Sequence, residues 1–133
     1  MTLAIRTELK DFAAKTLDIK CLVRTDGMEM PPHTDKPFAV ISDMNDAYVS
    51  ETKRRDSVRR SELYQITLLP KTNRQQLELS EILSEAFLFT NFTGFDVKSV
   101  HIQPLSPSDI SDELNKHRVY LSVTIERTVH RNY

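Results

Sequence analysis

Five basic residues fall within eight positions of one short segment, ETKRRDSVRRSE, which runs from Glu51 to Glu62. They are Lys53, Arg54, Arg55, Arg59 and Arg60. Basic side chains at this density can bind the phosphates of a nucleic acid or the carboxylates of a partner protein. The third interpretation is a charged, exposed connection between two strands, which keeps a sheet soluble and binds nothing.

The composition around these residues favours a protein partner over a nucleic acid. Five positive and three negative side chains leave the segment with a net charge of only +2, and the whole chain has a formal net charge of -1. Nucleic-acid-binding domains are usually strongly basic, and single-strand binders interleave aromatic residues that stack on the bases. No aromatic residue interrupts this segment. A nucleic-acid-binding accessory domain that uses residues 53–60 therefore stays the second hypothesis.

A cluster of acidic residues, Asp109, Asp112 and Glu113, lies in the polar segment PLSPSDISDELNK. A similar cluster can hold a cation in metal nucleases, but no apolar strand frames this one, and we interpret it as a surface for a basic partner. Two glycines exclude the phosphate-binding glycine motifs, and one cysteine with four scattered histidines offers no zinc spacing. We predict no catalytic, cofactor-binding or metal-binding residues and no enzyme activity.

The elements that position these charged segments can be predicted from periodicity. Apolar residues at helical spacing predict a first helix from Thr2 to about Leu17, and the Pro-rich stretch 24–37 predicts a long loop. FAVISDM, from Phe38 toward Val49, and the alternating segment LYQITLL predict two strands of an antiparallel hairpin. The basic segment is then the exposed tip of this hairpin.

A second helix is predicted to start after Thr72, which forms a capping box with Gln75. Its apolar face is expected to pack against two strands. The expected helix positions are Leu79, Ile82, Leu83, Ala86 and Phe87, and the strand positions are Tyr64, Ile66, Leu68, Val119, Leu121, Val123 and Ile125. FDVKSVHI predicts a strand with a bulge between Val97 and Val100, and HRVYLSVTIERTVHR predicts a long last strand.

This order predicts a single α+β domain, residues 1–133, in which two helices pack against an antiparallel sheet of about four to five strands. No apolar run approaches the roughly 20 residues that span a membrane. The amino terminus lacks the apolar core and cleavage site of a signal peptide. The single cysteine, Cys21, is compatible with a reducing cytoplasm. We therefore expect no contact with a membrane.

Several segments together resemble the tail completion proteins of long-tailed bacteriophages, which are also called tail terminator or tail-to-head joining proteins. The segments are the amino-terminal helix, the Pro-rich loop that leads into PFAVISDM, LYQITLLPKTNRQQLELSEILSEAF and HRVYLSVTIERT. Three features carry most of the resemblance: the loop ending in Pro37–Ile41, the helix from Leu77 to Phe89 after a strand and a polar turn, and the pair His117 and Arg118 that opens the last strand. The resemblance covers essentially the whole chain and is one of layout.

The resemblance implies an α+β virion protein that forms a homo-oligomeric ring, commonly a hexamer, at the head-proximal end of the tail tube. Such a ring stops tube growth and joins the tail to the head, with the tail tube protein and the head completion or connector protein as partners. DNA passes through it without specific binding, and assembly takes place in the host cytoplasm. The basic connection is longer than a family hairpin needs, and we predict that it meets the acidic segment of a neighbouring subunit or the head connector.

Overall fold

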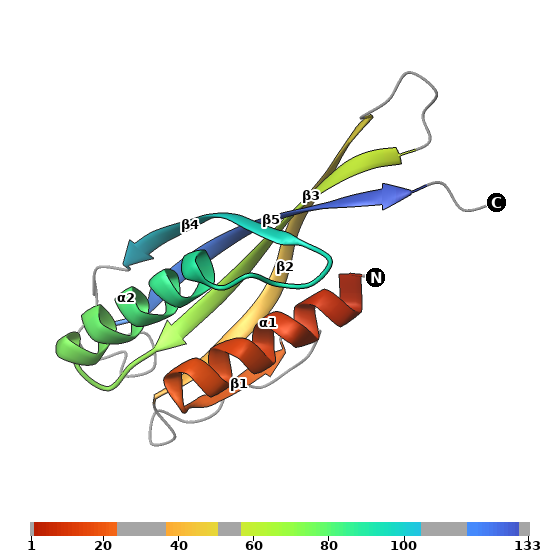
Figure 1. Cartoon of the computed structure of the whole chain (residues 1–133). Coiled ribbons are helices and arrows are strands. Elements are labelled where there is room, and N and C mark those ends of the chain that lie inside the picture. Colours follow the sequence, from red (N-terminus) through yellow and green to blue (C-terminus); the bar gives the residue numbers. More distant parts are fainter. Residues whose placement is uncertain (1, 24–36, 51–56, 105–116, 131–133) are drawn as a thin grey trace.

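A computed structural model describes residues 2–23, 37–50, 57–104 and 117–130 of the chain. Its elements are α1 (Thr2–Leu17), β1 (Lys20–Val23), β2 (Phe38–Ser50), β3 (Ser57–Leu69), α2 (Asn73–Phe89), β4 (Asp96–Pro104) and β5 (Val119–His130). The two predicted helices and the predicted strands β2, β3, β4 and β5 are confirmed in their order, and β1 is an additional strand. Figure 1 shows that α1 and α2 lie side by side on the same face of the sheet.

The five strands form one sheet in the order β1-β2-β3-β5-β4, so the predicted α+β fold is confirmed. The pairs β2–β3, β3–β5 and β4–β5 are antiparallel, as predicted. The prediction of a purely antiparallel sheet is wrong at one edge, because β1 pairs with β2 in parallel. Parallel neighbours need a long connection, which residues 24–37 supply between Val23 and Phe38.

The main core lies between the helices and the sheet. Leu9 and Ala13 of α1 and Leu83 and Phe87 of α2 are buried against strand residues. All the predicted strand positions are buried, namely Tyr64, Ile66, Leu68, Val119, Leu121, Val123 and Ile125. Leu79 packs partly buried against the same core. The apolar pattern therefore located the core correctly on the strands and on most of α2.

Ile82 is an exception, because 48% of it is exposed. It precedes Leu83 by one position, which turns its side chain about 100° around the helix from the buried stripe. The stripe of α2 that faces the core also includes three polar residues, Gln76, Ser80 and Ser84. The helix face predicted from apolar residues alone therefore differs from the buried face by a rotation about the helix axis. The prediction that Ile82 is buried is wrong.

A second, smaller cluster lies on the other face of the sheet. Along β2 the residues Ala39 and Ile41 belong to the main core, whereas Phe38 and Val40 pack with Leu69 in the second cluster. Alternate residues of a strand point to opposite faces, so this end of the sheet is buried on both sides. This explains the unbroken apolar run FAVI.

Local hydrogen bonds define the ends of the helices as the sequence predicted for α2. The Gln75 amide donates to Thr72 Oγ1 at 3.1 Å, and Gln75 Oε1 in turn accepts from the Lys71 amide at 2.8 Å. Helix α1 ends at Leu17 and is followed by Asp18, which has a φ of 53°, and the amide of Ile19 donates back to Ala14 O at 3.2 Å. Aspartate tolerates this left-handed conformation better than most residues.

The strands β2, β3 and β5 continue past the ends of the helices as a three-stranded projection (Figure 1). We call residues 45–50, 57–62 and 126–130 of these strands the arm. Strand β4 reaches only the base of the arm, because its pairing with β5 ends at Asp96 and Glu126. The β2–β3 register shifts between Asp43 and Asn45, at the base of the arm, and such a bulge bends a strand and increases its twist. The predicted bulge in β4 is also confirmed, between Val97 and Ser99.

Candidate protein-interaction surfaces

The arm carries two of the eight predicted interface residues, Arg59 and Arg60 on β3. The other six lie outside the described residues, namely Lys53, Arg54, Arg55, Asp109, Asp112 and Glu113. The predicted pairing of the basic segment with the acidic segment therefore stays a prediction. Arg59 and Arg60 themselves have very different surroundings.

Arg59 is exposed, whereas the side chain of Arg60 is only 15% exposed. Successive residues of a strand alternate between faces, and Arg60 shares the helix-covered face with Glu62 and Tyr64. The expectation that every basic side chain of the segment is an exposed charge is thus wrong for Arg60. Its charge is already used within the subunit.

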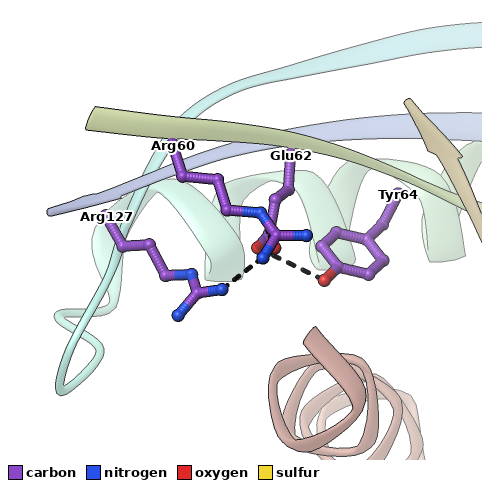
Figure 2. A network of polar contacts seen from close by, with 4 residues as sticks. All are labelled: Arg60, Glu62, Tyr64 and Arg127. Carbon is purple, nitrogen blue, oxygen red and sulfur yellow. Dashed lines mark hydrogen bonds and ion pairs between the residues drawn. The ribbon is translucent and has the colours of Figure 1, made fainter. Parts of the chain in front are cut away.

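Glu62 is fully buried and is the centre of a polar network (Figure 2). Arg60 Nε lies 2.8 Å from Glu62 Oε1, as an ion pair without the alignment of a hydrogen bond. Arg127, on the neighbouring strand β5, donates from Nη2 to the same oxygen at 3.4 Å. The Tyr64 hydroxyl donates to Glu62 Oε2 at 3.3 Å. The network therefore joins β3 to β5 at the base of the arm.

The electrostatics of this network explain why a carboxylate can be buried here. An ionised carboxylate without partners is very unfavourable in a protein interior, and two guanidinium groups compensate it. Conversely, Arg60 and Arg127 are direct partners in the β3–β5 register, where like charges would repel each other. Glu62 offsets that repulsion, so each part of the network requires the others.

Sequence reasoning missed Glu62 because it was counted as one of three acidic residues in an exposed segment. A signal was present in the sequence, since Glu62 is in phase with the apolar residues Tyr64, Ile66 and Leu68. Arg127 is likewise in phase with Val123 and Ile125 on the last strand. If the alternation of two residues is continued past the apolar positions of each strand, it places Glu62 and Arg127 on the same sheet face as the core residues.

A cleft of about 530 Å³ lies where β5 continues past the start of β4. Its lining mixes basic, acidic and aromatic residues: Arg59, Lys98, Arg127, Asp96, Glu126, Phe92, Phe95, Gly94 and Thr128. Lys98 and Glu126 form an ion pair of 3.9 Å across β4 and β5. Mixed charges of this kind suit ion pairs with a partner protein. Within the part of the chain that the structure describes, no group of three His, Cys, Asp or Glu side chains could hold a metal ion.

Four phenylalanines hold one wall of this cleft in place. The rings of Phe92 and Phe95 stack with their centroids 5.0 Å apart. Phe92 also lies 5.0 Å from Phe12 of α1, which in turn lies 5.0 Å from Phe87 of α2. Aromatic pairs at these separations are favourable beyond the area that they bury. The connection from α2 to β4 is thereby packed onto the core, and Gly94, with a φ of 90°, makes its turn.

The exposed side of α2 is unusually apolar. Among the described residues the large exposed apolar side chains are Leu77, Ile82, Leu88 and Phe89 of α2, together with Ile102 of the adjacent strand β4. Phe89 is 85% exposed. Contiguous apolar groups on a protein surface commonly mark an interaction site. The same side of α2 carries Glu78, Glu81 and Glu85, which are also exposed.

Cys21 is not a reactive site. Burial raises the pKa of its thiol to about 12, so that the nucleophilic thiolate is scarce near neutral pH. It packs in the main core between α1 and the sheet. We assign it a packing role.

Comparison of the sequence with protein-family models gives no match, and comparison with curated proteins gives no significant match. Within the described ranges, no helix combines the length and the apolar composition needed to cross a lipid bilayer.

Proposed function

We propose that this protein is a structural assembly protein whose copies associate into a ring at the head-proximal end of a phage tail. The observation that carries the proposal is the presence of two different candidate contact surfaces on one small α+β subunit. One is the arm, which extends past the helices (Figure 1). The other is the exposed apolar and acidic side of α2.

Two different surfaces are what a closed ring of identical subunits needs. In a ring, one patch of each copy meets a different patch of the next copy, and the rotation closes after a fixed number of copies. The arm and the exposed side of α2 differ in chemistry, since the arm exposes Arg59 whereas the exposed side of α2 carries apolar residues and three carboxylates. This pair supports a head-to-tail contact better than a symmetric dimer.

The place of the ring in a virion comes from the resemblance to tail completion proteins. The α+β fold agrees with the fold that this resemblance implies. In this proposal the ring, with a hexamer as the expected stoichiometry, caps the tube built by the tail tube protein and joins it to the head connector. Its work is surface complementarity, and DNA crosses the ring without sequence-specific contacts.

A direct test combines the purified protein with tail tube protein. Light scattering gives the mass of the assembly, and negative-stain electron microscopy shows whether rings sit on the ends of tubes. We expect rings of defined size and tubes capped at one end. A protein that stays monomeric at all concentrations, and leaves tube length unchanged, would contradict the proposal.

The competing hypothesis of a nucleic-acid-binding domain loses support from the structure. Arg60 and Arg127 both contact Glu62, so the charge on these two side chains is already partly neutralised. Phosphate binding by this region would depend on Arg59 and on residues of the segment outside the described part of the chain. Binding to duplex DNA across a salt series separates the two hypotheses, as described in the Discussion.

A further inference from the structure

We propose that the cleft at the base of the arm binds a short extended segment of a partner protein, which adds to the sheet as a strand beside β5. The segment carries an acidic residue for Arg59 and a basic group for Asp96. The site uses one edge of the arm and does not require that a ring forms.

Strand β5 has an open edge at its carboxyl-terminal end. Its residues Arg127 to His130 pair with β3 on one side. On the other side the pairing with β4 ends at Asp96 and Glu126, so no described strand lies beside Arg127 to His130 there. The N–H and C=O groups of one residue point to the same side of a strand, and successive residues alternate. Alternate residues of this stretch therefore present both backbone groups at the open edge, which is a template for a further strand.

The cleft of about 530 Å³ lies directly beside this open edge. Arg127 and Thr128 of β5 line part of it, and residues between Phe92 and Lys98, at the start of β4 and in the connection before it, line another part. Figure 1 shows that β5 continues past the point where β4 begins. A strand in line with β4, on the side of its amino-terminal end, would run along the edge of β5 at this level. The cleft therefore lies where an added strand would run.

The lining of the cleft favours a peptide over a small molecule. Small-molecule pockets of about 300–1,000 Å³ are lined predominantly by apolar side chains. Strand addition instead uses main-chain hydrogen bonds for affinity and side-chain pockets beside the edge for specificity. The edge of β5 offers the first, and the mixed lining offers the second. Five of the nine lining residues are charged, namely Arg59, Asp96, Lys98, Glu126 and Arg127.

Three of these five charges already have partners within the subunit. Lys98 and Glu126 form an ion pair of 3.9 Å across β4 and β5. Arg127 lies 3.4 Å from the buried Glu62. A partner segment that enters the cleft therefore meets these groups as part of its wall.

The two other charges define the chemistry of the segment. Arg59 and Asp96 are both exposed, and neither forms an ion pair with another described residue. Arg59 is in register with Thr128 and Asp96 with Glu126, so the two charges lie two positions apart along β5 (128 minus 126). Side chains two positions apart in an extended segment point to the same face. An acidic and a basic group at this spacing can reach both charges, and opposite charges at its two ends fix the direction of the segment.

A separate segment fits this place better than the sheet edge of a second copy. The cleft is bounded at one end by Asp96, where β4 begins, so a strand that enters must end or turn away there. Each described strand of a second copy is embedded in its own five-stranded sheet, and β2 and β4 are 13 and 9 residues long. The neighbours of such a strand would also have to fit beside the start of β4. A short segment or chain end meets no such obstacle.

Selection of short peptides on the full chain tests the site. A displayed library of random heptapeptides is selected on the purified protein, and the strongest binder is synthesised with both ends capped. We expect it to contain β-branched residues together with acidic and basic residues at the spacing i and i+2. NMR of the isotope-labelled protein should then show slower hydrogen exchange of amides in the stretch Arg127 to His130, and little change on α2. Failure to select a peptide, or slower exchange on α2 alone, would overturn the inference.

Two N-methylated versions of the selected peptide distinguish strand addition from other modes of binding. Only alternate N–H groups of a strand face one neighbour, so methyl groups on one set of alternate amides block pairing with β5, and methyl groups on the other set do not. We expect affinity to fall about tenfold for one version and to stay nearly unchanged for the other. Equal affinities of the two versions would show that the peptide does not pair with the strand edge.

Charge exchange tests the assigned side-chain contact. Arg59→Glu should weaken the selected peptide about tenfold, and a peptide with Lys in place of its acidic residue should recover binding to this variant. Lys71→Glu changes an exposed base outside the cleft and serves as the control. Equal affinity for the Arg59→Glu variant and the unmodified chain would overturn the contact. So would slow exchange in Arg127 to His130 that appears without peptide as the protein is concentrated, because a second copy would then occupy the edge. Light scattering reports ring formation separately, so the proposed function is tested apart from this site.

Discussion

Arg60 and Arg127 face each other on the adjacent strands β3 and β5, and both reach the same oxygen of the buried Glu62, at 2.8 and 3.4 Å. Two cations in register are stable only because a carboxylate lies between them. This places a charged cluster at the point where the arm leaves the helix-covered body. The cluster belongs to the architecture of the subunit, although part of it lies in a segment that looks like an exposed binding patch.

Replacing Glu62 by Gln should destabilise the subunit, because it removes the charge that compensates two guanidinium groups. Removing one partner of a buried ion pair typically costs about 3–5 kcal/mol, and we expect the lower end because Arg60 and Arg127 retain some exposure. Urea denaturation gives the free energy of unfolding. Glu126→Gln, which affects the more exposed pair with Lys98, is the control and should cost less than about 1 kcal/mol. Equal losses in the two variants would show that the network contributes nothing special.

Arg59→Glu and Arg60→Glu should differ sharply, although the two residues are neighbours in a basic run. Arg59 is exposed, and reversal of an exposed charge usually changes stability by no more than about 0.5 kcal/mol. Arg60→Glu places a second carboxylate beside the buried Glu62, so we expect loss of several kcal/mol or failure to fold. Circular dichroism and thermal melts of the two variants make the comparison. Similar melting temperatures would contradict the role assigned to Arg60.

Leu83→Ala and Ile82→Ala should also differ in their loss of stability, although the two residues are adjacent in the sequence. Leu83 is a residue of α2 that is fully buried in the main core, and truncation of a buried leucine costs about 2–5 kcal/mol. Ile82 is 48% exposed and should cost less than about 1 kcal/mol in the monomer, consistent with partial burial. The same Ile82 variant should weaken assembly if α2 is a contact surface. Urea denaturation of the two variants measures the free energy of unfolding, and light scattering measures assembly.

The exposed Arg59 and two arginines that lie outside the described residues, Arg54 and Arg55, can be tested together in tail-to-head joining. Reversal of Arg54, Arg55 and Arg59 to Glu should leave the subunit folded and block the joining of tails to heads, so that filled heads and finished tails accumulate separately. Arg60 is excluded from this variant because of its contact with Glu62. Normal yields of infectious particles would assign the segment to an exposed connection without a partner.

The same variant also tests the hypothesis of nucleic-acid binding, through its binding to duplex DNA at increasing salt concentration. Neutralisation of four or five phosphates would give a log–log slope of binding against salt of about -4. Tight binding of duplex DNA by the unmodified protein with such a slope, lost in the variant, would favour the nucleic-acid hypothesis. We expect only weak binding that differs little between the two proteins.

The Cys21 thiol should resist alkylation at pH 8 in the folded protein and react quickly in urea. Burial raises its pKa from 9.0 to about 12, so the folded state keeps the proton more tightly than the unfolded state. The protonated thiol therefore contributes to the stability of the folded state. This contribution is fully present below about pH 9 and is lost as the pH rises from 9 toward 12. Urea denaturation of Cys21→Ala and the unmodified chain from pH 7 to 10.5 should show a difference that narrows with pH. Rapid alkylation of the folded protein at pH 8 would indicate that the thiol is accessible.

The sequence by itself determined most of the secondary structure. The alternation in LYQITLL and in VYLSVTI predicted β3 and β5, because a strand buried on one face must repeat every two residues. The capping box of Thr72 and Gln75 predicted the start of α2 through local hydrogen bonds alone. The change of phase after Val97 predicted the bulge in β4. Each of these signals depends on residues close together in the chain.

Tertiary structure decided three other features, which depend on residues far apart. The parallel pairing of β1 follows from where the chain returns after residues 24–37, and no local pattern encodes it. The rotation of α2 that exposes Ile82 and buries Ser80 and Ser84 is set by the fit of the whole helix against the sheet. Glu62 became a core residue because Arg127, 65 positions later, is its partner on β5. A buried charge is stable only with its partner in place, and that partner is identified only once the strands are paired.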